Sequence, residues 1–480
     1  MKNVLVYPTK IIITNYTLGE CSKLERSLSV WDSVIFKVTF EGFKYDEENK
    51  ILTIPSGFNI AYLEALFINN EPNPIKYKID YSNKDIVEPY NKVSFSLKFP
   101  TRNTLQNEAT RFLEKTGNQK FLSLETGGGK TYCAIYHIFK SKKLPMTFVD
   151  QDSIANQWKD RIIYFTTIKE EEIYFISGQK SIDKLLNMKD KELKSYKWFI
   201  AIHRTLSNYL DNNGIEKLNE LFKKLKIGSR LYDEAHVEYK NIFNMDMSYN
   251  CESVYITATP SRSNPSENKV YQNMFSDKSI PRFIGRGENY QNVIIYKYNT
   301  HPEVYEEASM VSNYGFNVVK WNDYIMQDKI EIFTEALEKI FKNIYKTNKH
   351  KTCVLVKSID MCNYLYDDFI EFFTEKNITV GKFHSKIKNA KDELVKDVIF
   401  TTEKSFGKAI DIPGLSVCIN TVPCSSETVV TQIMGRLREI PDKEVFFIDM
   451  YDEGFSAQCR QASKRIRLYK NKAKKIYYIK

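Results

Sequence analysis

Three consecutive glycines followed by lysine and threonine form the stretch of this chain that most clearly suggests chemistry. A short apolar run, Phe121–Leu124, leads through Thr126 into Gly127, Gly128, Gly129, Lys130 and Thr131, and residues 132–140 are predicted to be helical. Glycines lack Cβ atoms, so backbone N–H groups can converge on a phosphate at the positive end of the new helix. Lys130 would reach the β/γ-phosphate oxygens, and the Thr131 hydroxyl would hold Mg²⁺. The stretch predicts a phosphate-binding loop; a chance Gly-rich turn before a helix is the alternative for this motif alone.

Two adjacent acids, Asp233 and Glu234, lie in the segment Leu231–His236 at the end of a later predicted strand. The pair suits ATP hydrolysis, because Asp233 can hold Mg²⁺ through water while Glu234 orients and deprotonates the attacking water. Residues 228–230 (Gly-Ser-Arg) interrupt the strand before them, so we expect this strand to be weak. A surface Asp-Glu at a strand end is the alternative for the dipeptide alone.

Three further groups of residues fit a nucleotide site. Gln106, on a helix predicted from residue 102 to 114, can accept from and donate to an adenine edge, although glutamine is common on helix surfaces. Thr257 and Thr259 follow a predicted strand, and their hydroxyls can bond the acid pair. Arg436 lies in the segment Gln432–Arg438, which we predict to open a helix. An arginine from a neighbouring domain can neutralise charge on the γ-phosphate, an effect worth about 10³ to 10⁵ in rate.

These residues require elements that hold them at one edge of a sheet. Apolar strands alternate with amphipathic helices in two series, which predicts parallel sheets with helices on both faces and ligands at the carboxyl ends of the strands. The first series has strands at 121–124, 146–149, 173–176, 198–202 and 254–256, besides the one before Asp233. The second has strands at 352–356, 379–383, 398–402, 416–420 and 444–448. The fold class is therefore α/β, with two tandem parallel-sheet domains.

The chain divides into five predicted segments. Residues 1–98 mix short β-like runs with a helix and are expected to form a small α+β accessory domain. The first large domain spans 99–280, a linker spans 281–299, the second large domain spans 300–453, and a basic C-terminal segment spans 454–480.

Composition narrows the class of protein and its partners. The 480 residues are 42% hydrophobic, and the eight cysteines form no C-x-x-C pair, which favours reduced thiols in an intracellular, cytoplasmic protein. We find neither an apolar run of about twenty residues nor a convincing signal peptide, so no membrane partner is expected. The net charge of +10 is concentrated after Phe455, where nine Lys/Arg occur without an acid. This segment favours a polyanion partner, with a solvated helix end as the alternative.

Taken together and in order, the motifs resemble those of superfamily 2 helicases over about residues 100 to 453. The motifs that carry the resemblance are Gln106, Thr126–Thr131, Gln157-Trp158, Asp233–His236, Thr257–Thr259, Ala409–Pro413 and Gln432–Arg438. Within the superfamily the chain looks most like phage DNA helicases of the UvsW and branch-migration type. The resemblance implies two RecA-like domains that close on ATP and Mg²⁺ while nucleic acid crosses both.

The resemblance also assigns roles to residues. It implies that Gly127, Gly128, Gly129, Lys130 and Thr131 bind phosphate, that Thr131 and Asp233 hold Mg²⁺, and that Glu234 serves water. It implies that Gln106 contacts adenine, that His236, Thr257 and Thr259 couple hydrolysis to movement, and that Gln432, Arg436, Arg438 and Asp411 complete the site from the second domain. The chain departs from the family pattern at three positions: Leu124 replaces the first loop glycine, Ala409 replaces a frequent glycine, and Arg438 follows Arg436 by two residues. On a helix that spacing would rotate Arg438 by about 100°, so Arg436 is the expected arginine finger.

The expected activity is an ATP-driven helicase or translocase that unwinds or branch-migrates forked or junction DNA in replication, recombination or repair. Because backbone contacts carry little sequence information, we expect the protein to recognise branched, forked or single-stranded DNA by structure. The open alternatives are a duplex translocase that does not separate strands, an RNA helicase or transcript-release factor, and an ATP-gated clamp with negligible turnover.

Overall fold

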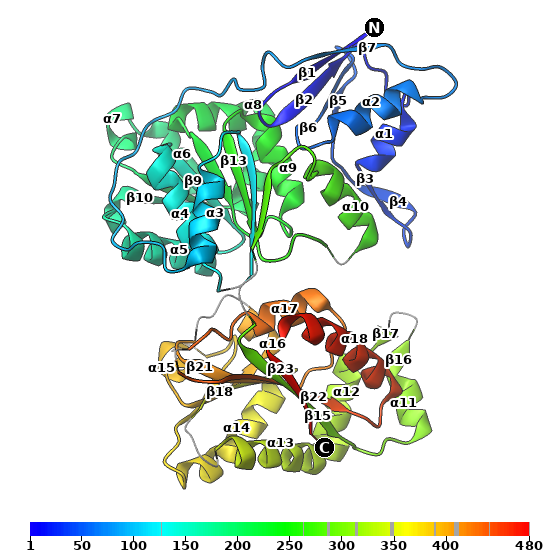
Figure 1. Cartoon of the computed structure of the whole chain (residues 1–480), viewed down its shortest axis with the longest axis vertical. Helices are drawn as coiled ribbons and strands as arrows, with labels where there is room; N and C mark the ends of the chain where they lie inside the picture. The colour runs from blue at the N-terminus through cyan, green and yellow to red at the C-terminus, as the bar shows by residue number, and fades with distance from the viewer. Residues whose placement is uncertain are drawn as a thin grey trace. The chain divides into compact units, whose positions relative to one another are not determined.

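The computed structural model describes residues 1–479 except 126, 263, 286–288, 313–314, 346–349, 388–389, 408–411 and 441. The chain folds into two compact units, residues 1–287 and 288–480, each with its own parallel sheet (Figure 1). In the described parts of the chain, we find no helix that is both long and apolar enough to span a membrane.

A small mixed sheet opens the first unit. Its strands lie in the order β5-β6-β2-β1-β7. Their bounds are β1 Lys2–Val6, β2 Lys10–Thr14, β5 Lys44–Asp46, β6 Ile51–Pro55 and β7 Tyr77–Asp80, with α1 Ser22–Ser27, α2 Ile60–Ile68 and a separate hairpin of β3 Ser29–Asp32 and β4 Lys37–Glu41. The core of this sheet is continuous with that of the large sheet that follows. The predicted small α+β fold at the N-terminus is confirmed, and it shares one compact unit and one core with the large sheet.

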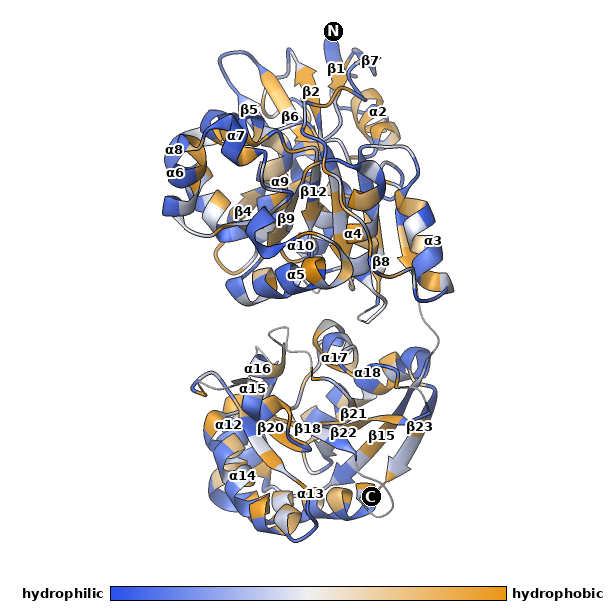
Figure 2. Cartoon of the chain, turned by 90° about the vertical axis from the view of Figure 1, so that its left-hand side faces the viewer, coloured by the Kyte–Doolittle hydropathy of each residue, from blue (hydrophilic) through white to orange (hydrophobic). Residues whose placement is uncertain are grey.

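The first large sheet has seven parallel strands in the order β10-β11-β9-β12-β13-β8-β14. The strands are β8 Gln119–Leu124, β9 Pro145–Val149, β10 Ile173–Ile176, β11 Trp198–Ile202, β12 Ser229–Tyr232, β13 Glu252–Thr257 and β14 Arg282–Gly285. The helices are α3 Thr104–Leu113, α4 Lys130–Ser141, α5 Asp152–Phe165, α6 Gln179–Asn187, α7 Asp190–Leu193, α8 His203–Leu225, α9 Tyr239–Ser248 and α10 Pro265–Met274, with a 3₁₀ turn at Glu170–Glu172. Because helices cover both faces, central strands such as β9 and β11 are buried along their whole length. Figure 2 colours the chain by hydropathy, with apolar residues in orange.

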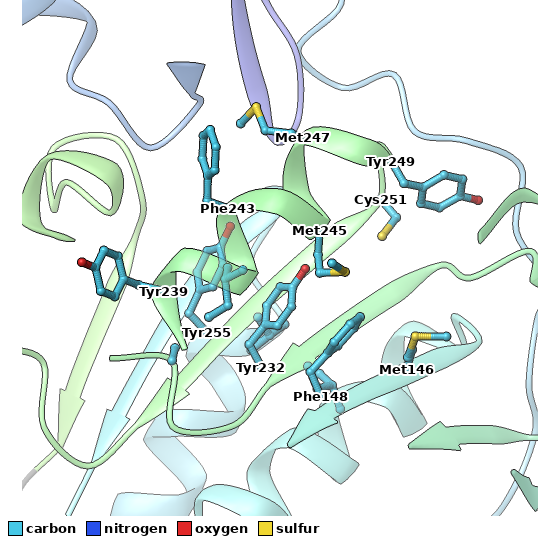
Figure 3. Packing of buried hydrophobic residues seen from close by; sticks show 14 of the residues in the cluster. Met146, Phe148, Tyr232, Tyr239, Phe243, Met245, Met247, Tyr249, Cys251 and Tyr255 are labelled. Atoms are coloured by element: carbon cyan, nitrogen blue, oxygen red, sulfur yellow. The ribbon is translucent and has the colours of Figure 1, made fainter. Parts of the chain in front are cut away.

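Aromatic side chains fix β12 beside its neighbours. Tyr232 of β12 stacks on Tyr255 of β13, with ring centroids 5.7 Å apart, and lies 4.7 Å from Phe148 of β9. Figure 3 shows these rings beneath α9, and both tyrosine hydroxyls donate to Asp246 on that helix, at 3.0 and 2.6 Å. Asp246 also pairs with Arg230 at 3.1 Å. The strand that was expected to be weak, β12, is therefore fully buried, because Arg230 is paired with Asp246 inside the fold.

The second unit has seven parallel strands in the order β19-β20-β18-β21-β22-β15-β23. They are β15 Gln291–Tyr298, β18 Lys351–Val356, β19 Val380–Phe383, β20 Val398–Thr402, β21 Leu415–Asn420, β22 Val445–Asp452 and β23 Lys475–Ile479. The other elements are α11 Val304–Met310, β16 Val311–Ser312, β17 Gly315–Phe316, α12 Val318–Tyr324, a π-helix at Ile325–Lys329, α13 Ile330–Ile344, α14 Ile359–Thr374, α15 Ala390–Leu394, α16 Glu403–Gly407, α17 Glu427–Met434 and α18 Ser456–Lys472. The predicted α/β fold class, with two parallel sheets in successive parts of the chain, is thus confirmed.

The structure differs from the sequence prediction at both ends of this second sheet. Residues 281–299, the predicted linker, contain β14 and β15, which pair into the first and second sheets respectively. Residues 454–480, the predicted basic segment, contain α18 and β23, and β23 pairs with β15. Within α18, Arg465 is buried and donates from Nε to Asp449 Oδ2 at 2.7 Å, and the Tyr469 hydroxyl donates to the same oxygen at 2.9 Å. This segment is therefore part of the core of its unit, not a detachable tail.

Candidate functional site

The phosphate-binding loop predicted from the sequence lies at the carboxyl edge of the first large sheet. β8 ends at Leu124, and α4 begins at Lys130. Between them Gly127 and Gly129 adopt φ values of 85° and 90°, which L side chains rarely adopt. A Cβ atom on Gly129 would lie 2.0 Å from Gln106 Nε2, so this position has no room for a side chain. Thr126, also predicted to belong to the loop, lies outside the described residues.

Leu124, which replaces the usual first glycine, has a structural role. It is fully buried and pairs in register with Gly285 of β14, where an added Cβ would lie 2.6 Å from Leu124 Cδ2. Its carbonyl oxygen accepts a hydrogen bond from Lys130 Nζ at 3.3 Å. The loop therefore turns only after Leu124, and this departure from the family pattern extends the strand.

Gln106 lies against this loop. Its backbone N–H donates to the N-cap residue Asn103 at 3.0 Å, and its Oε1 accepts from the Arg102 N–H at 2.9 Å. Arg102 itself donates from Nη2 to the carbonyl of Gly127. The segment that presents Gln106 is thus tied to the glycine loop through Arg102. Arg102 lies outside the recognised motifs and was not among the predicted site residues.

The acid pair lies at the same edge of the sheet. The strand that precedes it, β12, is separated from β8 only by β13, and all three are parallel. Asp233 Oδ2 accepts a hydrogen bond from Trp158 Nε1 of α5 at 2.8 Å, which gives the Gln157-Trp158 motif a physical role. Burial and the neighbouring Glu234 raise the pKa of Asp233 to about 6, while Trp158 and Lys130 act in the opposite direction. The structure therefore brings Lys130 and the acid pair together.

Glu234 has an uncommitted oxygen. The Glu234 backbone adopts a φ of 47°. Its side-chain Oε2 atom is buried without a hydrogen-bond partner among the described residues. His236 Nδ1 lies 3.4 Å from this oxygen, but that nitrogen is engaged by Thr257. A buried acceptor without a donor carries a free-energy cost, and a water molecule positioned for attack would supply one. Together with the Gly129 backbone and Lys130, this oxygen fits a site for a nucleotide phosphate and its hydrolytic water.

His236 connects the acid pair to the two threonines. Its Nδ1 lies 2.8 Å from Thr257 Oγ1 and its Nε2 lies 2.9 Å from Thr259 Oγ1. Burial, Arg262 and Lys130 lower the pKa of His236 to about 4, so the ring is neutral at pH 7. The single hydroxyl proton of Thr257 is donated to the Thr259 carbonyl at 3.0 Å, so Thr257 Oγ1 must accept a hydrogen bond from His236 Nδ1–H. In a neutral ring the other nitrogen, Nε2, carries no proton and therefore accepts from the Thr259 hydroxyl. All three predicted coupling residues thus form one network.

Arg262 extends this network beyond the predicted residues. It donates to the carbonyl oxygen of His236 and, from Nε and Nη2, to Glu267 Oε2 of α10 at 2.9 and 2.6 Å. Its guanidinium also lies 4.8 Å from the centre of the Tyr239 ring at the start of α9. Arg262 ends the Thr-Ala-Thr-Pro-Ser-Arg segment, and its charge beside that motif was the only sequence signal for this contact.

The residues predicted to complete the site from the second unit are arranged differently from the prediction. Gln432 lies on α17, but this helix ends at Met434. Arg436 follows it in a turn, and Arg438 lies in irregular structure beyond that turn. Gln291 Nε2 donates to the carbonyls of Met434 and Leu437, at 2.8 and 3.0 Å, and so satisfies groups that a longer helix would have bonded. The prediction that this motif opens a helix was wrong, and the expected 100° rotation of Arg438 does not apply. Asp411 and Ala409 lie outside the described residues.

Comparisons with known proteins agree with the motifs. Residues 98–262 match the family described as type III restriction enzyme, res subunit. The transcript termination protein A18 of Yaba monkey tumor virus is 20% identical over 419 residues, which cover 82% of this chain and 81% of the relative. Among solved structures, the Hef helicase domain of Pyrococcus furiosus aligns with a TM-score of 0.45 at 14% identity, over 76% of this chain and 98% of that one. T4 UvsW aligns with a TM-score of 0.39 at 13% identity, over 99% of each chain. The match over residues 98–262 supports the resemblance to superfamily 2 helicases that the motifs carry.

Proposed function

We propose that this chain is an ATP-driven nucleic-acid motor that unwinds or branch-migrates forked or junction DNA. The observation that carries the proposal is the convergence of Lys130, Asp233 and Glu234 at one edge of the first sheet, joined through His236 to Thr257 and Thr259. A bound ATP·Mg²⁺ would supply the phosphoanhydride whose hydrolysis releases the free energy for movement.

The chain's own residues have separate tasks in this proposal. The backbone of Gly127–Gly129 and the Lys130 ammonium bind phosphate, Gln106 contacts the base, and Thr131 and Asp233 hold Mg²⁺. Glu234 orients and deprotonates the attacking water. Gln432 and Arg436 of the second unit, with Asp411 and Arg438 beside them, complete the site when the two units close on the nucleotide.

A basic face on α18 supports a polyanion partner. Arg460, Lys464 and Arg467 are exposed and spaced three or four residues apart, which places them on one side of the helix. Buried Arg465 on the same helix belongs to the core instead. We propose that the exposed three contact phosphates, so a variant with all three changed to Gln should weaken binding and reduce its salt dependence. An Arg465→Gln control is expected to lose stability.

Transcript release is the second candidate function. It is favoured by the viral relative, whose name is transcript termination protein A18 and which aligns with 82% of this chain. A motor that moves along DNA or RNA could displace a transcript by the same cycle of closure and reopening. The motifs and the fold serve both candidates equally.

One set of measurements tests both functions. ATP hydrolysis is compared across single-stranded DNA, duplex DNA, branched DNA and RNA, and strand displacement is followed on matched DNA and RNA forks. Strongest stimulation by branched DNA, with displacement of DNA strands, supports the first proposal. Stimulation by RNA, or release of a transcript from a stalled polymerase complex without fork unwinding, supports the second. Hydrolysis that no nucleic acid stimulates contradicts both.

A further inference from the structure

The hairpin of β3 and β4 ends in an apolar tip that the described residues leave uncovered. Val34, Ile35 and Phe36 are 73%, 60% and 77% exposed, and Trp31 at the end of β3 is 51% exposed. Consecutive exposed apolar side chains contribute nothing to the core, and clustered ones mark sites of interaction. The tip lies in the first unit, at the edge of the small N-terminal domain (Figure 1).

The tip has one defined conformation. Asp32 Oδ1 accepts hydrogen bonds from the backbone N–H groups of Val34 and Ile35, at 2.8 and 3.3 Å. Phe36 follows with a φ of 50°, a left-handed conformation that is uncommon for a bulky residue. Together these features hold three apolar side chains on a short, tight turn.

The base of the hairpin is seated on the two helices that follow the catalytic motifs. The Trp31 backbone N–H donates to Ser266 Oγ of α10 at 3.2 Å. Phe40 of β4 packs edge-on against Tyr239 and Phe243 of α9, with ring centroids 5.5 and 5.8 Å apart. α9 follows the acid pair, and α10 follows Arg262, which joins Glu267 to the carbonyl of His236. The hairpin is therefore rigidly connected to the elements around the proposed hydrolytic site.

We propose that the tip formed by Trp31 and Val34–Phe36 is a wedge that packs against bases where a duplex opens. The inference rests on the proposed function, which supplies a nucleic acid with separating strands. Apolar side chains that insert between base steps unstack them, and aromatic rings stack on bases whatever the sequence. A wedge anchored on α9 and α10 would be held against the fork by the same unit that binds ATP.

Two other partners fit the tip less well. The hairpin carries Asp32 and Glu41 beside Lys37, so charge attracts it neither to an anionic lipid surface nor to a phosphate backbone, and the tip would contact the faces of bases. Four exposed side chains are also few beside the roughly 20 to 30 residues that each partner contributes to a stable protein interface. A fork requires only a small apolar edge, because one base step is separated at a time.

The test compares strand displacement with ATP hydrolysis in the full-length protein. The triple variant Val34→Ser, Ile35→Ser, Phe36→Asn removes the wedge, and Asn tolerates the left-handed backbone at position 36. A matched control, Val304→Ser with Tyr305→Ser, removes apolar side chains that are 85% and 72% exposed on α11. We expect displacement on forked DNA to fall roughly tenfold in the triple variant, the usual effect of losing a base-stacking contact. Hydrolysis stimulated by single-stranded DNA should stay within about twofold of wild type, and Phe36→Trp should keep displacement.

Each outcome assigns the result to one hypothesis. Equal displacement by the triple variant and wild type overturns the wedge and leaves the motor proposal standing. A wild-type protein that neither hydrolyses ATP in response to nucleic acid nor displaces strands contradicts the motor proposal itself. Displacement that falls equally in the α11 control overturns the assignment to the hairpin. Wild-type sedimentation with phosphatidylserine vesicles that the triple variant loses, with displacement unchanged, assigns the tip to a membrane instead.

Discussion

Each edge of the first large sheet holds one carboxylate with little exposure to solvent, buried Glu252 at one edge and half-buried Asp233 at the other, and the pKa values of the two are shifted in opposite directions. At the amino edge, Glu252 begins β13 and is met by His137 Nε2 at 2.9 Å, Lys120 Nζ at 3.1 Å and Lys143 Nζ at 3.3 Å. Burial alone would raise the pKa of Glu252, but these three partners lower it well below the usual range. At the carboxyl edge, Asp233 has one indole donor and a second carboxylate beside it, and its pKa is raised to about 6.

This difference distinguishes Glu252, whose charge stabilises the fold, from Asp233 and Glu234, whose charges are proposed to act in catalysis. Glu252 has every oxygen paired, whereas Glu234 Oε2 has no hydrogen-bond partner among the described residues. A carboxylate left with too few donors destabilises the folded state, and a bound ligand can relieve that cost. The carboxylates at the carboxyl edge therefore have the electrostatic properties expected of a site that binds a cation and a water molecule.

Replacing Lys130 by Ala should produce the largest effect. Loss of a cation that stabilises phosphate charge in the transition state is expected to lower the rate of ATP hydrolysis by about 10²- to 10³-fold or more, with nucleic-acid binding largely intact. Phosphate release, measured alongside binding to fluorescent single-stranded DNA, tests this. Unchanged hydrolysis would show that the glycine loop is not the nucleotide site.

Replacing Glu252 by Gln should have the second largest effect, on stability alone. The change leaves Lys120, Lys143 and His137 without a counter-ion in a buried setting, which is expected to cost about 3 to 5 kcal/mol of unfolding free energy. Because the folded pKa of Glu252 is lowered, its contribution is present above the unfolded pKa of about 4.3 and is lost in more acidic solution. Denaturant unfolding near pH 7 measures the loss. The rate of ATP hydrolysis per folded molecule should not change.

Replacing Asp233 by Asn is the same chemical change at the opposite edge, and its effect on stability should have the opposite sign. The folded pKa of about 6 lies above the unfolded value of about 3.9, so the charged form opposes folding at pH 7 by roughly 2 to 3 kcal/mol. Removing the charge should raise the melting temperature while abolishing hydrolysis. In wild type, the unfavourable contribution of ionised Asp233 to the free energy of unfolding disappears as pH falls from about 6 to 4. The free energy of unfolding of the variant should lack this pH dependence. A destabilised Asp233→Asn protein would mean that both edges are structural.

The features that sequence analysis predicted depend on local requirements. The glycine loop follows from its own backbone, and β10 and β11 have the bounds predicted from their apolar runs. The features it missed depend on partners distant in sequence. Arg230 can be buried only because Asp246 faces it from α9. Just beyond the end of α17, Gln291, on a strand within the predicted linker, donates to the carbonyls of Met434 and Leu437.

The roles of Gln432 and Arg436 remain proposals, because they depend on closure of the two units. The family resemblance implied coupling roles for His236, Thr257 and Thr259, and the two hydroxyls were expected to bond the acid pair. The structure shows both hydroxyls bonded to His236 instead. Arg102 and Arg262 were not predicted at all, since each contacts only backbone carbonyls of the motifs. Such contacts depend on where a side chain reaches, which residue type alone does not specify.

The smallest predicted effect concerns Trp158, which supplies the only hydrogen bond from a side chain to Asp233 among the described residues. Its indole N–H stabilises the charged carboxylate and so lowers the pKa of Asp233 relative to burial alone. In wild type, kcat/KM for ATP should fall below about pH 6, because this ratio reports ionisation in the free enzyme. Trp158→Phe keeps the apolar ring and removes the donor, so this acid limb should move to higher pH while the rate at pH 8 changes little. Phe165, also on α5, makes no contact with the acid pair among those resolved, and Phe165→Leu is the matched control. An acid limb that stays in place in Trp158→Phe would mean that Asp233 is not the group whose ionisation limits the reaction.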